Sequence, residues 1–355
     1  MSERHPIHLW PGAPLALGAA VLFGIATPFS KLLLGTVDPQ MLAGLLYLGA
    51  GMGLAGVHFG RDALGVPAPE AALKPADWPW LAAVVLFGGM LGPLFLMLGV
   101  ARTDASSASL LLNLEGLATM AIAWIVFREN VDRRLLLGAL AILAGAAALS
   151  WRGGDLSVGG GSIFIAAACL AWGLDNNLTR KLSAADPVVT AMTKGLAAGA
   201  VNTVIALIQG TRLPASTTLL AAGLLGFFAI GVSLVLFIRA LRHLGAARTG
   251  AYFSLAPFIG AVVAILVLRE PMTETLLVAG ILMGFGLWLH LAERHEHDHL
   301  HEAVDHDHSH RHDDGHHDHR HDGPVAEPHS HRHRHRRVWH SHIHYPDLHH
   351  RHSHD

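Results

Sequence analysis

The chain has 355 residues, of which 52% are hydrophobic and only 15% are charged, and its formal net charge is −2. Its mean hydropathy is +0.40 although residues 293–355 are strongly polar, so the remainder must be more apolar than this average. This composition excludes an ordinary soluble domain and predicts an integral membrane protein without a nucleic-acid partner. A single cysteine, Cys169, excludes an intramolecular disulfide and any cysteine-based metal site.

Apolar runs bounded by proline, glycine and charged residues predict ten membrane-spanning helices, because about 20 apolar residues cross a hydrocarbon core of about 30 Å. Arg4 precedes the first run as in a signal peptide, but an uncleaved helix fits better, since no soluble domain follows it. The expected helices are 14–34, 39–58, 78–100, 105–127, 132–150, 157–178, 187–209, 217–240, 247–268 and 273–292.

The segment Ala105–Gly145 is repeated at Ala246–Gly286. Each copy has an apolar run, an Arg-Glu pair, a short polar turn and a second apolar run with spaced glycines. Positions that match at a constant offset include Ala105/Ala246, Leu114/Leu255, Ala123/Ala264, Val126/Val267, Leu135/Leu276 and Gly145/Gly286. Five helices per half is an odd number, so the second half must enter the membrane from the opposite side. We therefore expect an all-α membrane protein built from two inverted five-helix repeats, an arrangement that secondary transporters use for alternating access.

Lysine and arginine near the helix ends set the expected orientation, because cytoplasmic loops carry the excess of these residues. One side collects Arg4, Arg61, Lys74, Arg128, Arg133, Arg134, Arg180, Lys181, Arg239, Arg242 and Arg248. We predict a multi-pass protein of the inner (plasma) membrane with both termini in the cytoplasm. Its parts are a cytoplasmic N-terminus at 1–13, the two repeats at 14–150 and 157–292, and a His-rich cytoplasmic tail at 293–355.

Three features of the sequence belong together: two five-helix halves, Gly24 and Trp172-Gly173 in the leading helices, and an Arg-Glu pair with a Gly-spaced helix that closes each half. In these features the chain resembles the drug/metabolite transporter superfamily, EamA-like type. The resemblance covers about residues 12–292 and rests on the overall pattern. It implies ten helices, cytoplasmic termini and movement of small metabolites such as amino acids. One departure is Asn113-Leu114-Glu115-Gly116, where the family commonly has an apolar or proline position.

Glu115 is the sharpest candidate for function, because the second repeat has Ala256-Pro257 where the first has this carboxylate. A charge in the middle of an apolar helix is costly, by about 2.5 kcal/mol or more, and normally faces a cavity or a partner. Glu115 can exchange a proton and couple transport to a proton gradient. The alternative is a carboxylate that locks its helix to a neighbour through Asn113 or Lys194.

Five further polar residues are predicted to lie near the substrate pathway, and Asn113, close to Glu115 in sequence, is the first of them. Lys194 can pair with an anionic substrate group or with Glu115, or can extend along its apolar stem to the interface. Asp175, Asn176 and Asn177 cover nearly a full helical turn, so at least one should face the bundle interior; the alternative is a frayed helix end at the interface.

Prolines and the duplicated Arg-Glu pairs are weaker signals. Pro28, Pro93 and Pro257 are candidate kinks at which a freed carbonyl can face the pathway. Arg128-Glu129 and Arg269-Glu270 fall at helix ends, where a structural turn is favoured over a gate or hinge salt bridge.

Most of the 28 histidines lie in the tail, which has no helical or strand period and is expected to be disordered alone. Imidazoles beside carboxylates favour Zn, Ni or Co, and the candidate ligands are His306, His308, His310, His312, His316, His317, His319 and His321. Three roles stay open: the tail buffers or senses metal, exchanges a metal that the bundle carries, or gains positive charge at low pH and attracts the anionic leaflet.

We predict a secondary transporter that moves a small organic solute, such as an amino acid, by alternating access, with efflux as the expected direction. No Gly-x-Ser-x-Gly elbow is present, so no enzyme is expected, and no cofactor is required. The alternative is a divalent metal transporter or metal-regulated carrier, ranked second because His58, His243 and His290 all fall near helix ends. The expected partners are the solute, the bilayer and divalent metal ions, with a homodimer as a further option.

Overall fold

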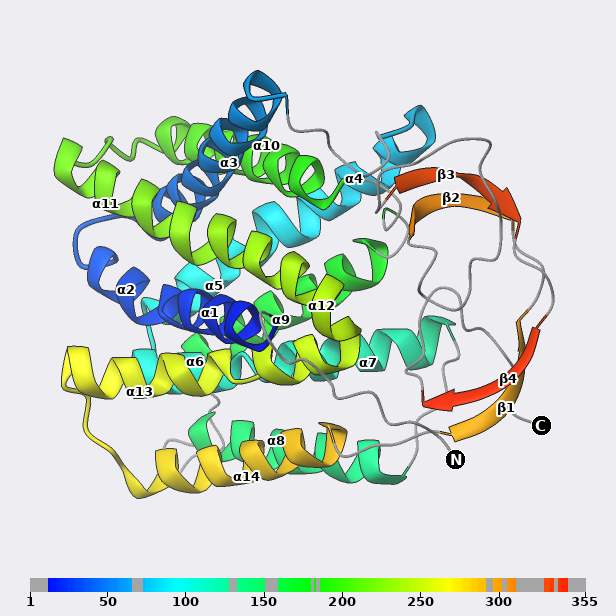
Figure 1. Cartoon of the computed structure of the whole chain (residues 1–355). Helices are drawn as coiled ribbons and strands as arrows, with labels where there is room; N and C mark the ends of the chain where they lie inside the picture. The colour runs from blue at the N-terminus through cyan, green and yellow to red at the C-terminus, as the bar shows by residue number, and fades with distance from the viewer. Residues whose placement is uncertain are drawn as a thin grey trace.

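The computed structural model describes residues 12–65, 73–127, 133–150, 159–179, 182, 186–291, 296–301, 305–310, 329–334 and 338–343. Residues 12–291 form a bundle of α-helices, so the predicted all-α membrane fold is confirmed (Figure 1). In the first half the helices are α1 (Gly12–Gly24), α2 (Ala26–Leu33), α3 (Pro39–Ala63), η1 (Pro75–Asp77), α4 (Trp78–Val84), η2 (Val85–Leu91), α5 (Gly92–Val100), α6 (Ala105–Leu111), α7 (Leu114–Phe127) and α8 (Arg133–Ser150). In the second half they are α9 (Gly160–Thr179), α10 (Pro187–Ile208), α11 (Ser216–Gly226), η4 (Phe227–Val232), α12 (Ser233–Phe253), α13 (Ala256–Leu268) and α14 (Glu274–Leu291).

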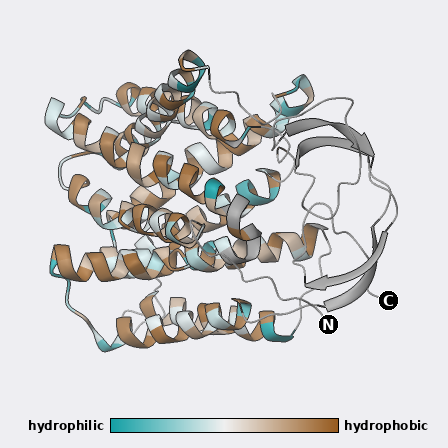
Figure 2. Ribbon diagram, in the orientation of Figure 1, coloured by the Kyte–Doolittle hydropathy of each residue, from teal (hydrophilic) through white to brown (hydrophobic). Residues whose placement is uncertain are grey.

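Within the described residues, nine segments are long and apolar enough to cross a membrane. They are Gly12–Leu33, Pro39–Ala63, Pro75–Val100, Ala105–Val126, Arg133–Ser150, Val188–Ile208, Ser216–Ala240, Thr249–Leu268 and Glu274–Leu291. The remaining predicted helix, the sixth in chain order, is α9, which has 20 residues, and Asp175, Asn176 and Asn177 lower its mean hydropathy. Figure 2 shows apolar residues along most of each helix, as a lipid-facing bundle requires.

Matching start signals open the second helix of each half. Asp38 precedes Pro39, and its carboxylate accepts the N–H groups of Gln40 and Met41 at 2.9 and 3.2 Å. In the second half Asp186 precedes Pro187 in the same way, and its carboxylate accepts from the first turn of α10. Aspartate caps the free N–H groups of the first turn, and proline at the first helical position lacks an N–H that would go unpaired.

The duplication extends to irregular helix geometry. The π-helix η2 interrupts the third span at residues 85–91, and the π-helix η4 interrupts the eighth span at residues 227–232. The fourth span breaks at Leu112 and Asn113, and the ninth breaks at Ser254 and Leu255. The first span also breaks, at Ile25, whereas its counterpart α9 is continuous, so the two halves differ there.

Helix pairing follows the repeat as well. The second and seventh spans, α3 and α10, pack together, and so do the fifth and tenth spans, α8 and α14 (Figure 1). Glycines bring these backbones close: a Cβ on Gly44 would lie 2.7 Å from the Thr203 nitrogen, and one on Gly286 would lie 2.5 Å from the Gly138 carbonyl. Gly280 and Gly284 on α14 do not make such contacts, because the nearest atoms to a Cβ there are 3.8 Å away.

The connection predicted between the eighth and ninth spans is helical. Residues 241–246 were expected to form a loop, but α12 continues through them to Phe253. This stretch contains leucine, arginine and alanine, which favour helix, and a single glycine is too weak a breaker to end it.

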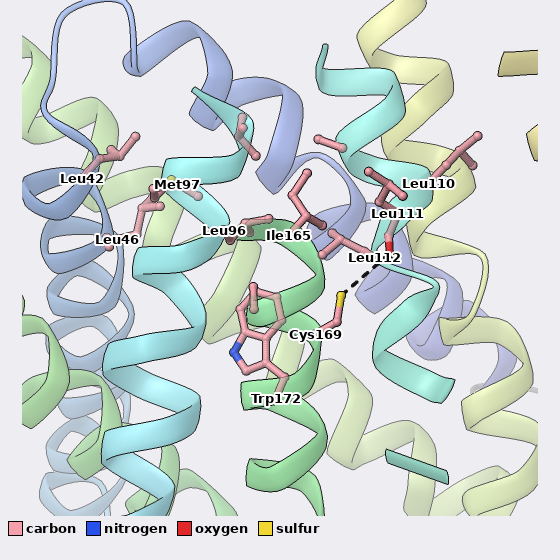
Figure 3. Close-up of a cluster of buried hydrophobic side chains, with 14 of the residues drawn as sticks. Leu42, Leu46, Leu96, Met97, Leu110, Leu111, Leu112, Ile165, Cys169 and Trp172 are labelled. Carbon is pink, nitrogen blue, oxygen red and sulfur yellow. Dashed lines mark hydrogen bonds between the residues drawn. The ribbon is translucent and has the colours of Figure 1, made fainter. Parts of the chain in front are cut away.

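Side chains from both halves build one apolar core. Figure 3 shows Leu42, Leu46, Leu96, Met97, Leu110, Leu111, Leu112, Ile165, Cys169 and Trp172 meeting between α3, α5, α6 and α9. The buried Cys169 thiol points to the Leu111 carbonyl at 3.7 Å and packs within this core.

Short strands form in the His-rich tail: β1 (Glu296–His301), β2 (Asp305–His310), β3 (His329–Arg334) and β4 (Val338–Ile343). β1 pairs with β4 and β2 with β3, both antiparallel (Figure 1). Strand pairing was not expected from the sequence, and disorder of the isolated tail stays a prediction.

Candidate functional site

Glu115 lies in the first turn of α7, directly after the break in the fourth span. The Asn176 side-chain amide donates to its Oε1 at 3.0 Å and also contacts the Thr119 hydroxyl oxygen at 3.1 Å. That hydroxyl donates to the Glu115 backbone carbonyl at 2.9 Å. The carboxylate is half-buried, and its hydrogen-bonding neighbour is a neutral amide. It therefore keeps an acceptor oxygen for a ligand or a proton.

An ion pair joins α9 to α10 beside this carboxylate. The Lys194 ammonium group donates to Asp175 Oδ2, and the two side chains are 19% and 8% exposed. The structure pairs Lys194 with Asp175 and not with Glu115 or the interface, and the role of Lys194 toward an anionic substrate group stays a prediction. Thr179 adds a hydrogen bond of 3.4 Å to Asp175 Oδ1. The pair is locally neutral, so Glu115 supplies the remaining negative charge.

The π-helix η2 packs directly against this ion pair. Gly88 has no side chain, and a Cβ at this position would collide with the Asp175 carboxylate. The Gly88 carbonyl accepts hydrogen bonds from Tyr47 Oη at 2.9 Å and Trp172 Nε1 at 3.0 Å. π-Helical turns inside α-helices are frequent at functional sites, because they reorient backbone groups and widen the local turn.

The remaining predicted residues separate into two groups. Asn177 is 3% exposed and donates to the backbone carbonyls of Thr119 and Gly173, at 3.1 and 2.8 Å, so it ties α9 to α7. Asn113 donates to the Leu110 carbonyl at 2.8 Å and contacts Met283 Sδ at 3.9 Å. Asn113 therefore closes the end of α6 and faces α14, away from the Glu115 hydrogen bonds. The expectation that residues 175–177 include inward-facing side chains agrees with the burial of Asp175 and Asn177.

Glu270 links the two halves through the start of α6. Its Oε1 accepts from the Ala105 N–H at 2.7 Å, and its Oε2 accepts from the Ser106 N–H at 2.8 Å. The preceding Arg269 ends α13 in a left-handed conformation, with φ of 56°. Glu270 thus acts as a helix cap that joins the halves, a structural contact in addition to the turn that the sequence favoured here. Arg128 and Glu129 lie outside the described residues.

Of the predicted metal ligands, His306, His308 and His310 lie in β2, and His312, His316, His317, His319 and His321 lie outside the described residues. Among all the residues that the structure describes, the strands of the tail included, no group of three or more His, Cys, Asp or Glu side chains could hold a metal ion.

Sequence reasoning missed Tyr47, Thr119 and the Gly88 carbonyl as parts of this site. Tyr47 and Thr119 each carry a polar side chain in an otherwise apolar helix, and this signal could have identified them from the sequence. The Gly88 carbonyl carries no such signal, because any backbone group could have taken its place.

The duplicated helices, the paired π-segments and the charged groups between α7, α9 and α10 define a membrane transporter with inverted repeats. The chain belongs to the EamA-like transporter family, whose model matches residues 10–151 and 159–292. It is 30% identical over 296 residues to an uncharacterized transporter of Methanothermobacter thermautotrophicus, covering 79% of this chain and 86% of that protein.

Three other similarities are weaker or shorter. The chain is 21% identical over 290 residues to the uncharacterized transporter YyaM of Bacillus subtilis, covering 77% of this chain and 93% of YyaM. It is 40% identical over 79 residues to a probable 4-amino-4-deoxy-L-arabinose-phosphoundecaprenol flippase subunit, ArnE, of Pseudomonas paraeruginosa, covering 22% of this chain and 66% of ArnE. One crystal structure has a TM-score of 0.57 at 19% identity, covering 79% of this chain and 96% of that one, which is a likeness of fold.

Proposed function

We propose that this protein is a secondary transporter of a small organic solute that carries an amino group, with an amino acid or a related zwitterion as the main class. The observation that supports this most is Glu115, a half-buried carboxylate with a neutral hydrogen-bonding neighbour beside the Asp175–Lys194 pair. An intramembrane charge is costly unless a partner or a cavity compensates it, so such groups commonly mark a transport pathway.

The chemistry of the three charged groups fits a zwitterion. Glu115 offers acceptor oxygens to the solute ammonium group, and Lys194 offers donors to the solute carboxylate when Asp175 shares it. When no solute is bound, a proton on Glu115 can neutralise the same oxygens. Solute and proton then compete for one carboxylate, which couples export of the solute to entry of protons.

The inverted halves provide the conformational change. Rocking of one half against the other around a site near the middle of the membrane gives alternating access. The excess of Lys and Arg on one side supports an inner-membrane protein with both termini in the cytoplasm. The similarity of a short segment to an aminoarabinose-lipid flippase subunit supports a cargo with an amino group.

Purified protein in proteoliposomes would test this function with a panel of amino acids, amines and organic acids, at two pH values on either side of the membrane. We expect counterflow of at least one amine-bearing solute, driven by an inward proton gradient. Movement of organic acids without any amine-bearing solute would contradict the proposal. The same panel with and without zinc or nickel separates metal regulation from solute transport.

A second candidate role concerns the tail, which we propose to bind divalent metal ions beside the carrier. In the antiparallel pair of β2 and β3, His306, His308 and His310 stand opposite His333, His331 and His329. The register therefore pairs histidine with histidine at three positions. Neutral imidazole is a good ligand for Zn, Ni and Co.

Removal of residues 295–355 tests the tail independently of the bundle. We expect the full chain to bind zinc or nickel in equilibrium dialysis, and the shortened chain to lose this binding and keep solute transport. If the shortened chain still moves metal across proteoliposomes, the bundle itself is a metal transporter, and the organic-solute proposal is replaced.

A further inference from the structure

Three helix breaks from both halves meet at one cavity. The first span breaks at Ile25, the fourth at Leu112 and Asn113, and the ninth at Ser254 and Leu255. A small pocket, with room for little more than one water-sized group, lies among these breaks and is lined by Phe23, Gly24, Thr27, Ser109, Leu112, Ala256 and Pro257. None of the charged residues of the site described above lines it. It is therefore a separate feature of the bundle.

Proline chemistry leaves a carbonyl of this cavity without its helical donor. In an α-helix the carbonyl of residue i accepts from the N–H of residue i+4, and proline has no N–H. Pro28 therefore cannot donate to the Gly24 carbonyl, and the next N–H, that of Phe29, donates to Ile25 at 3.2 Å. Pro257 removes the donor for Phe253 in the same way.

Two hydroxyl groups add to this set of oxygens. Ser109 is 1% exposed, and its hydroxyl has no hydrogen-bond partner in the described part of the chain. Thr27 is 2% exposed and lines the same cavity. Burying a hydroxyl without a partner costs free energy, so such a group in a cavity lining indicates a ligand that the protein accommodates.

Gly260 keeps this space open. A Cβ at Gly260 would lie 2.7 Å from the Gly24 carbonyl oxygen and 2.7 Å from the Ser109 hydroxyl oxygen. Both oxygens therefore face the same small volume, which a methyl group would fill.

We infer that this cavity binds a small monovalent cation, either an alkali ion or the ammonium group of a solute. Carbonyl and hydroxyl oxygens replace the hydration shell of such ions, and broken helices of transporters coordinate Na⁺ through unwound carbonyls and half-helix C-terminal ends.

The position of the site gives the cation a role in coupling. Gly24, Thr27 and Ser109 belong to the first half, whereas Pro257 and Gly260 belong to the second. A cation held between them stabilises the arrangement in which these segments are in contact. The inference does not rest on the identity of the transported solute.

Thermal unfolding of the purified full chain in detergent tests the site, with NaCl, KCl, methylammonium chloride or choline chloride at constant chloride concentration. We expect the unfolding midpoint to rise saturably with at least one of the first three salts relative to choline, which is too large for the cavity. Ser109→Ala and Thr27→Val should each require about tenfold more cation for the same rise, as the loss of one ligand worth about 1.4 kcal/mol predicts. Gly260→Ala should abolish the rise.

Ser254→Ala is the matched control, because this serine flanks a break but already donates to the Gly250 carbonyl at 2.7 Å. It should retain the cation response of the wild type. A response to methylammonium alone identifies a subsite for the solute amine, and a response to Na⁺ or K⁺ alone identifies a coupling ion. The inference is overturned if no cation differs from choline, or if the Ser109, Thr27 and Gly260 variants respond like the wild type.

Discussion

Glu115 on α7 and Asn176 on α9 are joined by a hydrogen bond of 3.0 Å from the Asn176 amide to the Glu115 carboxylate. The contact crosses from the first repeat to the second. Because the donor is a neutral amide, it holds the carboxylate in place without neutralising its charge. Glu115 can therefore change its proton or its ligand while the contact between the helices persists.

Replacing Glu115 by Gln should impair the coupling of transport. We expect transport driven by a pH gradient to fall by about tenfold or more, since loss of a charge-assisted hydrogen bond costs about 1.5–3 kcal/mol. Any residual transport should no longer depend on pH, because glutamine does not titrate. Proteoliposome uptake at several pH values checks this. Glu274→Gln, an exposed position at the start of α14, is the control and should behave like the wild type. An unchanged pH profile in Glu115→Gln would exclude the proposed role.

The Asp175–Lys194 pair should show strong coupling between its two substitutions. Asp175→Asn or Lys194→Met alone leaves one buried charge without its partner, which costs about 3–5 kcal/mol for a buried pair. The lower end of that range applies here, because the Lys194 side chain is 19% exposed. The double variant should recover part of the loss in unfolding free energy, measured in detergent.

Arg212→Met provides the matched control for that double-variant cycle, since Arg212 is an exposed cation outside the pair. It should change stability little and should be additive with Asp175→Asn. Additive effects of Asp175→Asn and Lys194→Met themselves would show that the ion pair contributes nothing to the folded state.

The Glu270 cap should contribute measurably to stability, because it satisfies two N–H groups at the start of α6 and places a negative charge at the positive end of the helix. Glu270→Ala should lower the unfolding free energy by about 0.5–2 kcal/mol, as loss of a helix cap does. Glu270→Gln keeps one acceptor oxygen and should give an intermediate value. Equal stability of all three proteins would show that water replaces the cap at no cost.

The sequence predicted which helices exist more successfully than which side chains meet. Hydropathy and the repeat identified the spans, and three adjacent polar residues in α9 predicted inward-facing groups. The partner of Lys194 was not predictable, because it depends on how α9 and α10 are rotated against each other. Each residue turns the helix by about 100°, so an error of one position changes the partner.

Asn113 also shows that the contacts of a side chain could not be predicted from its position in the sequence. Its proximity to Glu115 in sequence suggested a shared site, yet the two residues flank a helix break and point to different neighbours. The continuous helix α12 was missed because apolar periodicity ends at a membrane surface while helix propensity continues.

Gly88→Ala tests whether the π-helix and the ion pair form one unit. A Cβ at Gly88 would meet the Asp175 carboxylate. The Gly88 carbonyl also accepts hydrogen bonds from Tyr47 and Trp172, so η2 cannot move freely away from α9 to make room. We expect the unfolding free energy to fall by about 1–3 kcal/mol, as overpacking of a tight core predicts. Gly56→Ala in α3 is the control, because a Cβ there meets no atom within 4 Å. The control should be neutral or gain about 0.5–1 kcal/mol from higher helix propensity. If Gly88→Ala is as stable as Gly56→Ala and transports at the wild-type rate, then Asp175 moves aside without cost and its pairing with Lys194 is not essential.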